Sequence, residues 1–104
     1  MSDHALIVSF RYGRRDLAAL REVEARLEEA IKAAGAGEFD GDEIAVDGSD
    51  GSLYMYGPDA DRLFAAVRPV LEATSFMRGA TVRLRYGPPS GGAGEARVVI
   101  GEPN

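Results

Sequence analysis

Residues that could carry catalysis are sparse in this chain of 104 residues. It contains no cysteine, which excludes disulfides, thiolate metal ligands and a cysteine nucleophile. The single histidine, His4, lies beside the N-terminus, where a general base seldom has a fixed hydrogen-bonding partner. We therefore expect a non-enzymatic protein with no catalytic residue and no cofactor.

A run of carboxylates is the next candidate for chemistry. It consists of Asp40, Asp42, Glu43, Asp47 and Asp50. The run lacks the spacing and the terminal glutamate of an EF-hand loop, which favours a solvated hairpin over a calcium site. An enzyme that uses Asp40, Asp42 or Glu43 as a base stays an alternative, although no paired acid or orienting group can be named. We predict no metal site.

Composition and charge limit the kinds of partner that we expect. With 45% hydrophobic and 28% charged residues, the chain is typical of a soluble globular domain. A net charge of −5 is unfavourable for binding phosphates, so we expect no nucleic acid. No apolar run reaches the ~20 residues of a membrane span, and the first residues do not resemble a signal peptide. We expect a cytoplasmic protein without a membrane partner.

Two hydrophobic spacings alternate along the chain and predict its elements. Two-residue alternation predicts strands at 5–12, 43–47, 52–56, 81–86 and 96–100. Three-to-four-residue spacing predicts one helix from Leu17 to about Ala34, with Asp16 as its N-cap and Gly35 as its C-cap. A second helix opens at 57–61, with Pro58 in its first position, and should bend at Pro69 without breaking.

This order of elements predicts an α+β fold. Specifically, it predicts a ferredoxin-like two-layer sandwich of βαββαβ order with an extra C-terminal antiparallel strand. We expect one domain over residues 1–104, ordered from about 4 to 101, with a mobile glycine- and proline-rich loop at 87–95. In such a sandwich the helices cover one face of the sheet and leave the other face for a ligand or partner.

Alternation along the strands assigns residues to these two faces. The inward positions are Leu6, Val8, Phe10, Ile44, Val46, Leu53, Met55, Val82, Leu84, Val98 and Ile100. The opposite face carries Ile7, Ser9, Arg11, Tyr54, Tyr56, Arg83, Arg85, Arg97 and Val99, with Glu43 and Asp47 on the hairpin strand.

Tyrosine and arginine are enriched on this second face, and both residue types are common in binding surfaces. A solvated sheet face is the alternative, because these residues also suit exposed strands. We predict a binding site at Arg11, Tyr54, Tyr56, Arg83 and Arg85. Arginines lie on the late strands and carboxylates on the hairpin, so two copies packed face to face and antiparallel would match opposite charges.

Several motifs resemble a group of small bacterial proteins of unknown function. The motifs are residues 37–43 (GEFDGDE), 51–61 (GSLYMYGPDAD), 67–71 (VRPVL) and 84–87 (LRYG). The resemblance spans most of the chain, and it implies no activity, cofactor or catalytic residue.

Two classes of function remain in competition. The first is an interaction protein that binds a protein partner or a second copy through the open sheet face. One version neutralises a basic toxin, since some bacterial immunity proteins are similarly small, acidic and cysteine-free. The second is a small-molecule-binding regulatory module that resembles ACT-type domains, which have the same order of strands and helices.

Overall fold

The computed structural model describes residues 3–88, 92 and 94–101. Its elements are β1 (His4–Arg11), α1 (Ala18–Ala34), β2 (Glu38–Ile44), β3 (Asp50–Gly57), α2 (Ala60–Glu72), a 3-10 helix η1 (Ser75–Met77), β4 (Thr81–Arg85) and β5 (Glu95–Val99). The predicted mobility of the 87–95 loop concerns in part residues 89–91 and 93, which lie outside the described residues.

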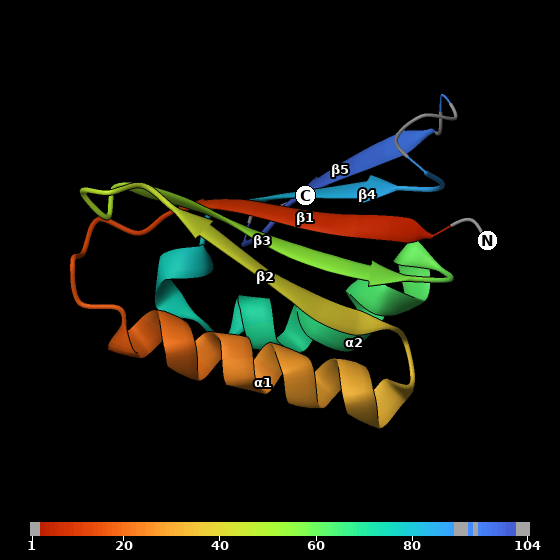
Figure 1. Ribbon diagram of the computed structural model, residues 1–104, viewed down its shortest axis with the longest axis horizontal. Helices are drawn as coiled ribbons and strands as arrows, with labels where there is room; N and C mark the ends of the chain where they lie inside the picture. The colour runs from red at the N-terminus through yellow and green to blue at the C-terminus, as the bar shows by residue number, and fades with distance from the viewer. Residues whose placement is uncertain (1–2, 89–91, 93, 102–104) are drawn as a thin grey trace.

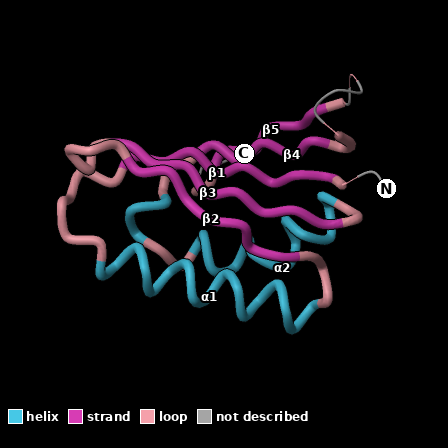
Figure 2. Tube along the Cα trace, in the orientation of Figure 1, coloured by secondary structure: helices cyan, strands magenta, loops and turns pink. Residues whose placement is uncertain are grey.

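The protein is an α+β structure with two layers (Figure 1). Both helices lie against the same face of a five-stranded sheet, as the trace in Figure 2 also shows. The strand order is β2-β3-β1-β4-β5, and every neighbouring pair is antiparallel. β1 is therefore the central strand, and the predicted C-terminal strand forms one edge.

α1 forms where the sequence predicts it, because its apolar residues make one continuous stripe. Leu20, Val23, Leu27 and Ile31 are buried against the sheet. Gly35 ends the helix in a left-handed conformation with φ of 59°. At the N-terminus the backbone cap is Leu17, one residue later than predicted, although Asp16 Oδ1 still accepts a hydrogen bond of 2.9 Å from Ala18 N.

α2 begins at Ala60, two residues later than the sequence indicates. Asp59 is its N-cap, and Asp59 Oδ1 accepts hydrogen bonds from the amides of Asp61 and Arg62 at 3.0 and 3.3 Å. Pro58 thus precedes the cap, so its predicted place in the first helical turn is wrong. The helix continues through Pro69 to Glu72 as a single element.

The second strand departs furthest from the prediction of 43–47. The predicted strand leaves out residues 38–42, but β2 starts at Glu38 and pairs with β3 from Glu38↔Tyr56 to Ile44↔Gly51. A bulge at Asp40 interrupts the register between Phe39 and Gly41. Pairing with β3 satisfies the backbone of this segment, and this outweighs the low strand propensity of its glycine and acidic residues.

Two predicted face assignments fail as a consequence. Val46 was expected in the core but lies fully exposed in the β2–β3 turn. Asp47 was expected on the open face, yet its Oδ1 accepts a hydrogen bond of 2.9 Å from Ser49 N within the same turn. The turn comes early because Gly48 O accepts from the amide of Gly13, 2.7 Å away, in the β1–α1 loop.

The core lies between the sheet and the two helices. The other inward strand positions of the prediction are buried or half-buried in it: Leu6, Val8, Phe10, Ile44, Leu53, Met55, Val82, Leu84, Val98 and Ile100. Leu63, Phe64, Val67 and Leu71 from α2 pack on the same side. Within the described residues, none of the helices has the length and apolar character needed to cross a membrane.

Candidate functional site

The sheet face turned away from the helices, called the open face below, carries side chains in rows that cross all five strands. The first row consists of Glu38, Tyr56, Ala5, Arg85 and Glu95, in order from β2 to β5. The middle row consists of Gly41, Tyr54, Ile7, Arg83 and Arg97. The third row consists of Glu43, Ser52, Ser9, Thr81 and Val99.

Four of the five predicted site residues surround the centre of this face. Tyr54 and Arg83 flank Ile7 on either side, and the next row repeats the arrangement with Tyr56 and Arg85 around Ala5. Ile7 is only 8% exposed and Ala5 is fully buried, although both lie on the open face. The larger neighbours therefore enclose a small apolar centre on β1.

The fifth predicted residue lies apart. Arg11 is at the end of β1, two rows beyond Ile7 along the same face, and its register partner on β3 is Asp50. It is exposed. The structure thus divides the predicted site into a central group of two tyrosines and two arginines and a separate arginine at one end.

Hydrogen bonds hold two of the four central side chains. Tyr54 Oη donates to Glu43 Oε1 at 2.7 Å, and this bond to a carboxylate raises the pKa of Tyr54. Arg85 Nε donates to Gly87 O at 2.7 Å. The first contact joins β3 to β2 and the second lies at the end of β4, and both side chains remain half-buried, where they can meet a partner.

The guanidinium Nε of Arg83 lacks the kind of hydrogen bond that Arg85 makes. Its Nε lies 3.8 Å from Glu95 Oε1, is covered by surrounding atoms and makes no hydrogen bond to a described residue. Its register partner on β5 is Arg97, so two like charges lie directly opposite each other. Such a pair opposes folding of the isolated sheet. Glu95 offsets part of this repulsion through its ion pair with Arg83.

Charge is distributed unevenly over the open face. Glu38 and Glu43 lie on β2, whereas Arg83, Arg85 and Arg97 lie on β4 and β5 with Glu95. One side of the face is therefore acidic and the other mainly basic, and β1 separates them.

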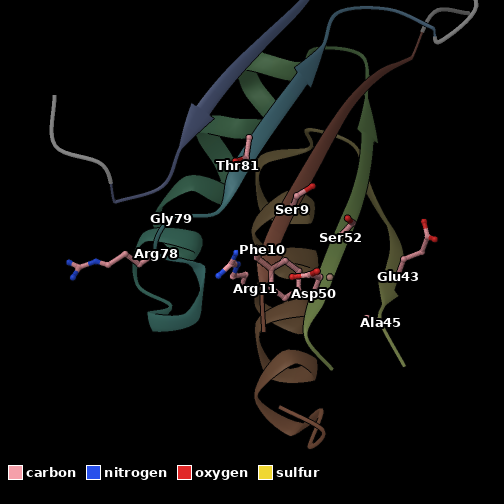
Figure 3. Close-up of a pocket in the computed structure, with 11 residues that line it drawn as sticks. Ser9, Phe10, Arg11, Glu43, Ala45, Asp50, Ser52, Arg78, Gly79 and Thr81 are labelled. Atoms are coloured by element: carbon pink, nitrogen blue, oxygen red, sulfur yellow. The ribbon is translucent and has the colours of Figure 1, made fainter. Parts of the chain in front are cut away.

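A shallow groove of about 680 Å³ occupies the end of the open face nearest Arg11 (Figure 3). Its floor contains the hydroxyl groups of Ser9, Ser52 and Thr81, which come from three adjacent strands. Arg11 and Asp50 lie beyond this row, whereas Glu43 and Arg78 point outward on opposite sides (Figure 3). The groove offers neutral hydrogen-bonding groups with one charge of each sign at its end.

The sequence did not indicate a second polar cluster on the helix side of the sheet. Asp42 lies two residues before Ile44 and therefore on the same side of β2, where it pairs with Leu53 and faces α1. Arg21 Nη1 donates to Asp42 Oδ2 at 2.7 Å and to Glu24 Oε1 at 3.1 Å. Burial and the neighbouring Asp42 carboxyl raise the pKa of Glu24 from 4.5 to about 7. The only available signal was Asp42 itself, which was considered as a base without a partner.

The other potential catalytic groups have structural roles. His4 was expected to have no fixed partner, which is wrong: its Nδ1 accepts a hydrogen bond of 3.0 Å from Ala60 N at the start of α2. The edge of its ring also packs against Tyr86, with 5.8 Å between ring centroids. Across residues 3–88, 92 and 94–101, no three His, Cys, Asp or Glu side chains gather in a way that could hold a metal ion.

Comparisons of the chain with protein-family models, with curated proteins and with solved structures found no match. Function is therefore inferred from the geometry of the open face.

Proposed function

We propose that the protein is a non-enzymatic interaction module that binds a protein partner through its open face. The observation that supports this proposal is the arrangement of side chains at the centre of the open face. Two consecutive rows there read Tyr54–Ile7–Arg83 and Tyr56–Ala5–Arg85, and no helix of the described residues covers them. Tyrosine and arginine combine a broad contact area with directional hydrogen bonds, and they are the residues most often found in energetically dominant positions of interfaces.

We further propose that the fold is ferredoxin-like. The support is the interleaving of its two strand–helix–strand units: β3 lies between β1 and β2, and β1 lies between β3 and β4. In this arrangement both helices cover the same face, so the opposite face is open by construction. β5 widens that open face by one strand.

The net charge of −5 suits a basic protein partner. Neutralising a basic toxin is one specific version of the proposal. The acidic side of the open face, at Glu38 and Glu43, would then contact cationic groups of the toxin. A panel of basic nucleases and toxins provides the test, and uniformly absent binding would remove this version.

The groove at the end of the face favours a second candidate, a regulatory module that binds a small molecule as ACT-type domains do. Arg11 could pair with a carboxylate and Asp50 with an amine, while Ser9, Ser52 and Thr81 offer hydroxyl groups between them. An amino acid is the simplest ligand with this chemistry. At 100 times its dissociation constant it should stabilise the protein by about 2.7 kcal/mol in a thermal-shift screen. No shift across amino acids and nucleotides would exclude this candidate.

The interaction proposal is tested with the double variant Tyr56→Ala/Arg85→Ala. Both side chains lie off the core, so we expect its free energy of unfolding to stay within about 1 kcal/mol of the wild type. Truncating such anchors commonly weakens binding by about 2 kcal/mol or more. We therefore expect loss of self-association and of binding to the basic panel, measured by sedimentation and by calorimetry.

Arg26→Ala on the exposed surface of α1 is the matched control and should leave association unchanged. If the double variant unfolds, these side chains belong to the core and the face assignment is inverted. If it folds and every association survives, the open face is a solvated surface and the proposal fails.

A further inference from the structure

We infer that a second copy of this chain binds the open face, and that the two copies are related by a twofold axis running along β1. This inference rests on the proposed function and specifies its partner. It follows from the order of charges and aromatic groups across the five strands.

Symmetry determines which groups meet in such a dimer. Rotation by half a turn about an axis parallel to the strands reverses the strand order and keeps each row at the same height. β2 then faces β5 of the second copy, β3 faces β4, and β1 faces β1. Ile7 of one copy therefore meets Ile7 of the other at the centre of the middle row.

The tyrosines and arginines become direct partners under this rotation. Tyr54 on β3 faces Arg83 on β4 of the second copy, and Tyr56 faces Arg85 in the next row. Each contact occurs twice because the axis repeats it. A guanidinium above an aromatic ring is attracted to the ring face, more strongly where water is excluded. The central group of the open face is thus complementary to itself.

The charges at the edges select the same axis. With β2 facing β5, Glu43 of one copy approaches Arg97 of the other from the adjoining row, although Glu38 then lies opposite the like charge of Glu95 in the first row. The carboxylate would offset the repulsion between Arg83 and Arg97, which Glu95 compensates within the single chain only on the Arg83 side. A twofold axis perpendicular to the strands gives the antiparallel packing expected from the sequence, but it would place β2 on β2 and β4 on β4, so like charges would oppose each other.

The size of the face is sufficient for a reversible dimer. β1 and β3 have eight residues each, β2 has seven, and β4 and β5 have five each; at ~4.8 Å between strands and ~3.3 Å per residue, each copy has a face of roughly 500 Å². Two such faces bury about 1,000 Å², the smallest area expected of a specific interface. Packed sheets cross at about 30°, which separates the two Arg11 side chains at the end of β1.

Charge reversal in trans is the decisive experiment. Glu43→Arg and Arg97→Glu, each alone, should weaken self-association about tenfold or more, because each creates a like-charge contact twice. Mixing the two variants should restore association, since positions 43 and 97 then carry opposite charges at both contacts of the mixed dimer. Sedimentation of each variant and of the equimolar mixture measures this. A mixture that associates no better than its components overturns the arrangement.

Crosslinking tests the position of the axis independently. The chain has no cysteine, so Ser9→Cys introduces a single thiol on β1 beside the axis. Facing sheets lie ~10 Å apart, too far for a disulfide, so the probe is a short bis-maleimide. We expect a covalent dimer from Ser9→Cys and none from the matched control Ser75→Cys in η1. Equal crosslinking of both overturns the axis.

The outcomes separate this inference from the proposed function. If the wild type is monomeric at all concentrations but Tyr56→Ala/Arg85→Ala loses binding to a basic protein, the dimer is overturned and the interaction module stands. If neither association exists, both fail.

Discussion

Glu24 and Asp42 share the guanidinium of Arg21 between α1 and β2, and this contact ties the helix to an edge strand. The arrangement is sensitive to protonation, because burial and the nearby Asp42 raise the pKa of Glu24 to about 7. Glu24 therefore changes its protonation state near neutral pH. We therefore expect the stability of the protein to depend on pH.

The sign of this dependence follows from linkage. Glu24 has an ordinary pKa of 4.5 in the unfolded chain and about 7 in the folded protein. The folded state therefore binds more protons between these values, and stability decreases as the pH rises from about 5 to 8. After allowance for solvent screening, we expect the free energy of unfolding to decrease by roughly 1–2 kcal/mol over this pH range.

Urea denaturation of Glu24→Gln over this pH range provides the measurement. The variant should show a flatter profile than the wild type, because the amide does not titrate. Glu28→Gln, on the exposed side of α1, should keep the wild-type slope. A Glu24→Gln profile parallel to that of the wild type would refute the role of this carboxyl.

At the scale of elements, the β2–β3 turn is anchored to the β1–α1 loop. Gly48 is buried, has a φ of 77°, and its carbonyl accepts from the amides of Gly13 and Arg14. A Cβ atom at Gly48 would lie 1.9 Å from Arg14 O, which is backbone and cannot rotate away. This close approach fixes where β2 ends.

Gly48→Ala should therefore destabilise the protein by roughly 3 kcal/mol, through both the clash and the left-handed backbone. Gly13→Ala is the matched control, since Gly13 has a φ of 71° but no atom within 4 Å of the added Cβ. It should lose only about 1–2 kcal/mol, the penalty for the backbone conformation. Chemical denaturation measures both variants. If Gly48→Ala and Gly13→Ala lose the same free energy of unfolding, the backbone at Arg14 moves away from the added Cβ without cost.

At the scale of the whole molecule, two helices cover only one face of a five-stranded sheet (Figure 1). A partner on the other face would add a second layer of contacts to the central strand β1. Binding that requires the folded state also stabilises it by mass action. Thermal stability should therefore depend on protein concentration if a second copy is the partner.

We expect the wild-type Tm to rise by several degrees as the concentration increases to about 100 times the dissociation constant of the dimer. Tyr56→Ala/Arg85→Ala should show a Tm that does not change with concentration. Differential scanning calorimetry measures both. A constant wild-type Tm over the same range would argue against self-association.

The sequence alone was sufficient to locate most elements and to sort their faces. Leu6, Val8 and Phe10 alternate with Ile7 and Ser9, and a strand with one buried face requires such a period of two. The same rule placed Tyr54, Tyr56, Arg83 and Arg85 together on the face opposite the core, and the structure has them there. Local periodicity carries this information because each element buries one side.

Only the tertiary structure decided where β2 runs and which side chains meet. The bulge at Asp40 breaks the alternation, so Phe39 turns toward the core beside Met55, and the early β2–β3 turn takes Val46 out of the core. The period of side chains along one strand contains no information about a bulge, about the neighbouring strand or about its register. The Tyr–apolar–Arg rows and the Arg21–Glu24–Asp42 cluster arise from hydrogen-bonded pairing and helix packing between residues distant in the chain.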